Sequence, residues 1–276
     1  MFSSSSCSTS KRWLSLPKKV ELRVLAGEVD IRGDNSNLKM KQHFIQVWLC
    51  LGSDNMALPM AGLQDAQAQI NQSIQFEQVR FAEVGGGWAE EPQMELMEGL
   101  SIPWTAPTLA TLPSFSSTCW LLARELHKAK GGPVGVIGVY VNSTDLWPWT
   151  PIETLAACRP EGKPRERGNW NAMLYPLLNT SATGGIFYEG QVDVEEGGSL
   201  EHHSCMLNGT LSTWMQLQNL TKLGLVGLGN DQGQGKFSWP HLRYIQQNLT
   251  RYIFSCNSPV TTELNGTKST LSDNAI

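Results

Sequence analysis

The chain lacks both a long apolar run and an excess of positive charge. Crossing a bilayer takes about 18 consecutive apolar residues, and no stretch of the 276 residues approaches that length. The formal net charge is -4 and the pI is about 5.8, whereas chains that bind nucleic acid usually carry a basic patch. The sequence therefore predicts neither a membrane span nor a nucleic-acid partner.

Cysteine is widely spaced, and no Cys-x-x-Cys pair occurs. The six cysteines are Cys7, Cys50, Cys119, Cys158, Cys205 and Cys256. This spacing supports neither a zinc cage nor a thioredoxin-like redox motif, and we expect no metal and no organic cofactor. Disulfides can form among these residues, but the sequence does not reveal their pairing.

The two sequence signals for the cellular compartment conflict. The Ser-rich first ten residues contain no apolar core of a signal peptide. Seven N-x-[ST] glycosylation motifs occur where chance predicts about two. They lie at Asn71, Asn142, Asn179, Asn208, Asn219, Asn248 and Asn265. The excess favours a glycoprotein of the secretory pathway.

Apolar strands alternate with helical patterns along most of the chain. The pattern predicts strands at 44–51, 79–84, 133–140, 184–188 and 223–228, and helices at 57–74, 115–129, 200–220 and 241–253. Residues 88–113 are expected to form a loop, and 169–178 a helical turn interrupted at Pro176. This alternation predicts a three-layer α/β/α sandwich with a mostly parallel, flavodoxin-like sheet.

The chain divides into three parts. Residues 1–42 are expected to form a disordered start followed by a partial β region. Residues 43–256 carry the α/β domain, and residues 257–276 are a polar tail without periodicity. The chemistry is expected at Gly52-Ser-Asp-Asn-Met56, because open α/β sheets place reactive groups where a strand ends and a helix begins.

Several blocks of the chain resemble one family of esterases. Val47-Trp-Leu-Cys50 and Gly52-Ser-Asp-Asn-Met56 are similar to the motif V-W-L-C-S-G-Q-S-N-M of the sialate O-acetylesterases. Trp170-Asn-Ala-Met-Leu-Tyr-Pro-Leu177 resembles W-N-A-M-I-x-P-L, and Phe187-Tyr-Glu-Gly-Gln-Val-Asp193 falls where the family has W-Y-Q-G-E-S-N. The resemblance covers about residues 44–245. It implies an SGNH-hydrolase-like fold and an enzyme of the lysosome or the extracellular space.

The resemblance also implies a reaction, in which a serine removes O-acetyl groups from sialic acids or related sugars through an acyl-enzyme. The serine of the family motif corresponds to Asp54, and Ser53 stands one residue earlier. A shift of one residue turns a side chain toward the opposite face. Ser53 could therefore serve only if the turn were remodelled, and its ordinary role is a helix N-cap.

The groups that would stabilise an oxyanion also depart from the family pattern. The family's G-G-T-P-I-E-A-W segment corresponds to Asn142-Ser-Thr-Asp-Leu-Trp-Pro-Trp149, with Asn142 and Ser143 in place of two glycines. Asp193 replaces a donor asparagine, and an anion beside a developing oxyanion is electrostatically unfavourable. Asn142 also heads a glycosylation motif, so that a glycan there is expected at the mouth of the site.

The family's catalytic histidine belongs to a later Asp-x-x-His segment, which does not occur in this sequence. We therefore expect the domain to be incomplete on its C-terminal side. The histidines present (His43, His127, His202, His203 and His241) are expected to serve surface or core roles. Acidic clusters at strand ends can also hold Mg²⁺ or Ca²⁺, and Asp54, Asp145 and Asp193 form one alternative of this kind.

Two hypotheses follow from these residues. The first is an acetylesterase that acts on O-acetylated sialic acid or another acetylated sugar. The second is a catalytically inactive glycoprotein remnant or glycan-binding pseudoenzyme that keeps the fold. The ten tryptophans fit a protein that handles carbohydrate, although most tryptophans serve the core. The altered positions favour loss of hydrolysis.

Overall fold

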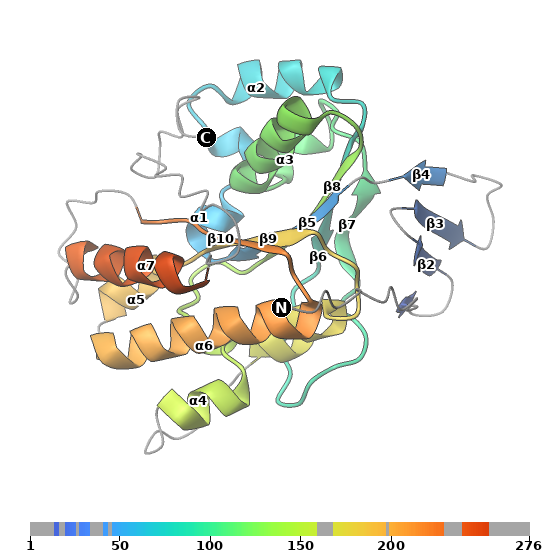
Figure 1. Ribbon diagram of the computed structural model, residues 1–276. Coiled ribbons are helices and arrows are strands. Elements are labelled where there is room, and N and C mark those ends of the chain that lie inside the picture. The colour runs from blue at the N-terminus through green and yellow to red at the C-terminus, as the bar shows by residue number, and fades with distance from the viewer. Residues whose placement is uncertain are drawn as a thin grey trace, which may run out of the picture.

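The computed structural model describes residues 14–16, 20–25, 28–33, 41–43, 46–158, 168–196, 199–228 and 239–253. It contains a four-stranded sheet and a six-stranded sheet with helices around the latter (Figure 1). The predictions of a disordered start for residues 1–13 and of a polar tail for 257–276 lie outside the described residues.

The first sheet corresponds to the partial β region. Its strands are β1 (Leu14–Leu16), β2 (Val20–Leu25), β3 (Glu28–Gly33) and β4 (Lys41–His43). They pair in sequence order and antiparallel, with Leu22 opposite Ile31. The partial β region expected within residues 1–42 thus forms a sheet whose first strand begins at Leu14.

The second sheet is mostly parallel, as the sequence predicts. Its strands are β5 (Gln46–Gly52), β6 (Val79–Val84), β7 (Leu100–Thr105), β8 (Val134–Tyr140), β9 (Gly184–Tyr188) and β10 (Lys222–Leu225). The order is β10-β9-β5-β8-β6-β7, and only the β6–β7 pair is antiparallel. The first parallel strand of the chain, β5, therefore lies between β8 and β9. In flavodoxin, whose strand order is 2-1-3-4-5, the first strand instead lies between the second and the third.

Alternate residues of β5 enter two separate cores, because successive side chains of a strand point to opposite faces. Leu49 and Leu51 pack with α4 (Ile152–Cys158) and α6 (Leu200–Gln218). Trp48 and Cys50 pack with α3 (Ser117–Lys130) and the first turns of α7 (Trp239–Ile253). In Figure 1, α2 and α3 lie above the sheet and α4 and α6 below it, which confirms the three-layer sandwich.

The long helix expected at 57–74 is broken into short pieces. These are α1 (Asp54–Ala57), a 3₁₀ turn at Met60–Gly62, α2 (Ala66–Gln72) and a 3₁₀ turn at Ser73–Gln75. Pro59 lacks an N–H and biases the residue before it away from helical geometry, and Leu58 accordingly has a ψ of 115°. The helical spacing of the apolar residues therefore reflects which side chains are buried against one side of the sheet, and the helix itself is not continuous.

Two further segments refine the expectations. The stretch 88–113 contains strand β7 and a 3₁₀ turn at Leu112–Ser114 in addition to loop. The predicted helical turn at 169–178 is a π-helical turn, Trp170–Leu174, followed by a 3₁₀ turn, Tyr175–Leu177. Pro103 lies within β7, a strand at the edge of the sheet, where proline is tolerated.

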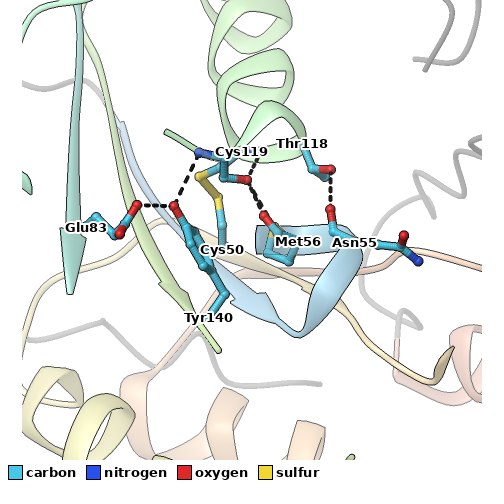
Figure 2. The surroundings of a disulfide bond; sticks show 8 residues. Cys50, Asn55, Met56, Glu83, Thr118, Cys119 and Tyr140 are labelled. Carbon is cyan, nitrogen blue, oxygen red and sulfur yellow. Dashed lines mark hydrogen bonds between the residues drawn. A yellow bond between two sulfur atoms is a disulfide. The ribbon is translucent and has the colours of Figure 1, made fainter. Parts of the chain in front are cut away.

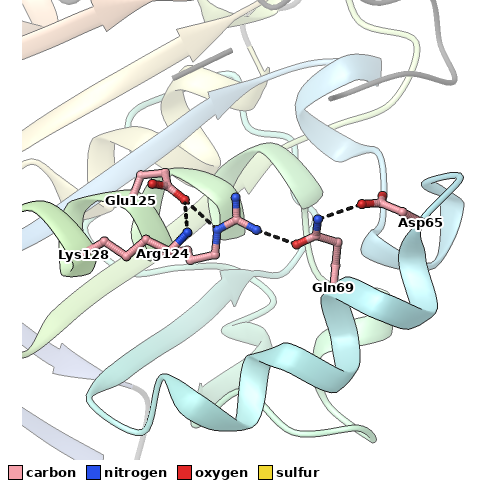
Figure 3. Close-up of polar contacts among 5 residues, drawn as sticks. All are labelled: Asp65, Gln69, Arg124, Glu125 and Lys128. Carbon is pink, nitrogen blue, oxygen red and sulfur yellow. Dashed lines mark hydrogen bonds and ion pairs between the residues drawn. The ribbon is translucent and has the colours of Figure 1, made fainter. Parts of the chain in front are cut away.

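Polar contacts hold α2 against α3 (Figure 3). The guanidinium of Arg124, which is only 6% exposed, donates to the Gln69 side-chain oxygen and to Glu125. Gln69 in turn donates to Asp65, over 2.7 Å. A buried cation needs such partners, because an unpaired charge in the interior is costly.

Two disulfides join helices to neighbouring elements. Cys50 of β5 is bonded to Cys119 of α3, and Cys158 of α4 to Cys205 of α6. Cys7 and Cys256 lie outside the described residues. Within the described residues, no helix is long and apolar enough to span a membrane.

Candidate active site

The strand–helix junction after β5 has a backbone that only glycine accommodates. Gly52 has a φ of +154°, and a Cβ on it would lie 2.0 Å from the carbonyl oxygen of Tyr188 in β9. The next amide, that of Ser53, donates to this same oxygen over 3.2 Å. Glycine thus permits β5 and β9 to approach at their carboxyl ends, and residue 54 leaves the sheet at the start of α1.

Helix α3 fixes the far side of the junction (Figure 2). The Ser116 hydroxyl donates to the Met56 carbonyl over 2.5 Å and caps α3 by accepting from the Cys119 amide. Thr118 donates to the carbonyl of Asn55. The Cys50–Cys119 disulfide joins α3 covalently to β5, the strand that precedes the junction. The Asn-Met pair of the motif is therefore anchored by backbone contacts.

Tyr140, at the end of β8, adds a polar contact to this anchor. Its hydroxyl donates to the Glu83 carboxylate and accepts from the Ser116 amide. Burial, together with the negative charge of Glu83, raises the pKa of Tyr140 above its usual range. Tyr140 thus stays a neutral donor that links β8, β6 and α3.

The position that the family motif assigns to the nucleophile is occupied by a carboxylate that is already hydrogen-bonded. The side chain of Asp54 is half-buried, and its Oδ1 accepts from the Ser143 backbone amide over 3.0 Å. Ser143 keeps the left-handed backbone of a glycine position, with a φ of 56°. Asp54 and Ser143 are thus brought together, and Asn142 beside them is exposed.

Ser53 lies in a different environment. It is only 1% exposed, and its side chain makes no capping hydrogen bond to α1. The expected N-cap role is therefore not fulfilled by its hydroxyl, because the backbone at Ser53 (φ -116°, ψ -138°) does not direct the side chain to the first turn. A buried hydroxyl has no access to a substrate carbonyl.

Asp193 is held by groups of the protein itself. Its Oδ2 accepts from the Leu146 amide over 3.1 Å, and its Oδ1 lies 3.0 Å from Nδ1 of His203. Glu189 is close by and 2% exposed, and neither of its carboxyl oxygens has a hydrogen-bond partner of ordinary geometry. In the sheet, β9 lies next to β5 on the side opposite to β8. The loop after β9 therefore places these groups beside the junction, at the same edge of the sheet.

The two acids titrate in opposite directions. Burial, and then the charge of Asp193, raise the pKa of Glu189 well above its usual value. Burial alone would raise the pKa of Asp193 also, but its hydrogen bonds with Glu189 and His203 lower it. The pKa values of two acids in one buried site separate in this way, because ionising both would place two negative charges close together in the interior. The pKa values of the two acids are thus driven apart, with the protonated form favoured at Glu189 and the ionised form favoured at Asp193.

Two histidines of the described residues, His203 and His127, are packed into the fold. His203 is 2% exposed, and its Nε2 is buried without a partner. His127 is half-buried, with Nδ1 2.8 Å from the Gly132 carbonyl oxygen. His202 and His241 are exposed.

The Asp193–His203 pair was not predicted from sequence. The residues are ten apart and belong to different helices, α5 (Gln191–Glu196) and α6. Ser199 caps α6 by accepting from the His202 amide, which fixes the helical phase of the adjacent His203. The capping serine was the one signal that could have indicated which histidine turns inward.

The alternative of a cation site finds no support in this part of the chain. The described residues contain no group of three or more His, Cys, Asp or Glu side chains placed to hold a metal ion. Asp54 binds the Ser143 amide and Asp193 binds His203 and the Leu146 amide. Asp54 and Asp193 are thus each already engaged by donors of the protein.

Comparison with known proteins identifies chains of similar sequence. No profile of a known protein family matches the chain. The chain is 24% identical over 255 residues to sialate O-acetylesterases of Pongo abelii and Homo sapiens, which covers 82% of this chain and 48% of theirs. It therefore spans about half the length of these curated relatives.

The fold has a counterpart among solved structures. A carbohydrate acetylesterase from Xanthomonas citri superposes with a TM-score of 0.68 at 22% sequence identity, over 88% of this chain and 56% of that one. This similarity concerns the fold, since the identity is low. The chain is thus similar in sequence to the sialate O-acetylesterases and similar in fold to a solved carbohydrate acetylesterase.

Proposed function

We propose that this chain is a sialate O-acetylesterase-like protein that no longer hydrolyses acetyl esters and instead binds acetylated sugars. The observation that carries the loss of hydrolysis is the hydrogen bond from the Ser143 amide to Asp54. In an ester hydrolase, a serine would occupy position 54 and an amide such as that of Ser143 would face the oxyanion. Here a carboxylate occupies the position of the serine, and it already accepts the hydrogen bond of the Ser143 amide.

The other required groups support the same proposal. Asp193 is an acceptor, engaged with Leu146 and His203, and so offers no proton to an oxyanion. The Nδ1 of His203 lies against Asp193 and its Nε2 is buried, so this histidine has no path to a substrate. A carboxylate at position 54 without an accessible base would not complete a hydrolytic cycle.

The binding half of the proposal is supported by the position of the junction. Open α/β sheets bind ligands beyond the carboxyl ends of the strands where the strand order reverses. That reversal lies at β5 and β9, which are followed by Asp54 and Asp193. Asn142 and Ser143 are exposed at this edge, and the solved acetylesterase of similar fold acts on carbohydrate by its name.

Hydrolysis can be tested with 4-nitrophenyl acetate and purified protein. We expect no turnover above a heat-denatured control, and none after Asp54→Ser, because the substitution supplies a hydroxyl but no base. Turnover by the unmodified chain would refute the proposed loss of activity. If Ser53→Ala then abolished that turnover, Ser53 would be the nucleophile despite its burial.

We also propose that the chain matures in the secretory pathway as a glycoprotein. Both disulfides fit an oxidising compartment. Five of the asparagines in glycosylation motifs are exposed, namely Asn71, Asn142, Asn179, Asn208 and Asn219. Asn248 is half-buried, and Asn265 lies outside the described residues.

Glycosylation is open to a direct measurement. After expression in a secreting eukaryotic cell, we expect enzymatic removal of N-glycans to lower the intact mass, and peptide mapping to find a glycan on Asn142. Asn142→Gln should remove that one glycan and leave the others. An unchanged mass after glycan removal would contradict the proposal, and a bare Asn142 would remove the glycan from the mouth of the site.

A further inference from the structure

One aromatic side chain near the sheet edge is exposed and has no role in the fold so far described. Trp88 is 42% exposed and follows β6, whose carboxyl end lies at the same edge as the junction. The loop that carries it, residues 85–99, also exposes Glu90 and Glu91. An exposed indole offers a flat apolar face together with one polar N–H, the combination for which tryptophan is enriched at interfaces.

The indole is held in place by a glycine. Gly168 is buried, and a Cβ on it would lie 1.6 Å from Cδ1 and 2.2 Å from Nε1 of Trp88. The ring thus lies directly on the backbone at residue 168, while part of its surface faces solvent. An aromatic ring with one side fixed loses little freedom when a ligand covers the other.

The loop itself is anchored to Gly168 and Asn171, at the start of the block that ends at Leu177. The Asn171 side-chain amide donates to the carbonyl oxygens of Ala89 and Glu90, over 3.1 and 2.7 Å. The Ala89 amide donates to the Gly168 carbonyl, and the Gln93 amide to that of Asn171. The residues next to Trp88 are therefore fixed by four hydrogen bonds, which makes the ring a positioned group.

We propose that Trp88 is a stacking platform for a second sugar ring of a glycan whose acetylated residue lies at the junction. The proposal rests on the glycan-binding half of the proposed function. The ends of β5 and β6 are two inter-strand spacings apart, about 10 Å, which an oligosaccharide spans and a single sugar does not. The apolar face of a pyranose would cover the indole, and the carboxylates of Glu90 and Glu91 would accept from its hydroxyls.

The test compares two ligands by calorimetry: O-acetylated N-acetylneuraminic acid, and the same acetylated sugar linked to lactose. We expect the trisaccharide to bind about tenfold more tightly, the affinity that one aromatic contact contributes. Trp88→Ala should remove this advantage without changing the affinity for the monosaccharide. Trp88→Phe, which keeps a smaller ring, should retain part of it.

Two further variants separate stacking from folding. Gly168→Ala keeps the indole but displaces it, and should remove the trisaccharide advantage as Trp88→Ala does. Met94→Ala removes another exposed apolar side chain of the same loop, 68% exposed, and should leave the advantage intact. Unchanged monosaccharide affinity in each variant reports that the junction is folded.

Equal affinity for the two ligands, or a trisaccharide advantage that survives Trp88→Ala, would overturn the proposal. Absence of binding by either ligand would overturn it together with the glycan-binding half of the proposed function. Ester turnover would refute only the loss of hydrolysis. In that case an increase in KM for the trisaccharide alone, on Trp88→Ala, would support the platform.

Discussion

Replacing Cys50 and Cys119 together with alanine is expected to lower the free energy of unfolding by about 4–5 kcal/mol. The bond closes a loop across a sequence separation of 69 residues, and removing a cross-link of that span restores about 4 kcal/mol of chain entropy to the unfolded state. Both cysteines are fully buried, so that the lost sulfur atoms also leave a small cavity. Urea unfolding followed by circular dichroism measures the change.

The second disulfide provides a matched control. Cys158 and Cys205 close a separation of 47 residues, and Cys205 is exposed. Their double alanine variant is expected to lose about 3–4 kcal/mol and to leave the junction intact, since α4 and α6 pack on the other face of β5. Equal stability of the unmodified chain and the Cys50/Cys119 variant would contradict the cross-link's role. The same measurement under reducing conditions reports how much free energy of unfolding the chain would lose in a reducing compartment.

Much of the fold was predictable because its signals are local. The buried strands at Gln46–Gly52 and Val134–Tyr140 are short apolar runs bounded by turn residues, which pattern alone identifies. The break at Pro59 shows a limit of prediction from apolar spacing. Buried side chains on one face can recur at helical spacing even where the helical backbone hydrogen bonds are interrupted. Strand β7 was missed because Pro103 and Trp104 occur in a loop-like context, and only its pairing with β6 makes it a strand.

The place of the candidate site in the fold was predictable, whereas the contacts among its residues were predictable only in part. Strand–glycine–helix chemistry indicated Gly52–Met56 and motif spacing indicated Asn142, Ser143 and Asp193. The sequence could not indicate that Asp54 would accept from Ser143, because that bond joins the ends of two strands 89 residues apart. Nor could it indicate that His203 turns inward to Asp193, since this depends on the phase of one helix against another.

The buried acid Glu189 gives the second large expected effect. Glu189→Gln is expected to stabilise the protein at pH 7, because a neutral amide avoids the free energy that burial of this carboxyl beside Asp193 costs there. The pKa of Glu189 is raised above its usual 4.5 by burial and by Asp193. The folded state therefore retains a proton that the unfolded state loses, so that stability is fully present below about pH 4.5 and declines as the pH rises through the folded pKa.

Glutamine removes this decline while keeping the shape of the side chain and a donor toward Asp193, and it is the residue that the family motif has at this position. Stability of the variant should therefore change little between pH 5 and 8, whereas that of the unmodified chain falls. Asp193 acts in the opposite sense: its pKa is lowered, so its contribution is present above about pH 3.8 and is lost as the pH falls, in both proteins.

Chemical unfolding at a series of pH values measures these curves, with Glu90→Gln as the control. Glu90 is an exposed carboxyl, and its replacement is expected to change stability by less than about 0.5 kcal/mol at any pH. A pH dependence of Glu189→Gln that parallels the unmodified chain above pH 4.5 would show that Glu189 is ionised in the folded protein.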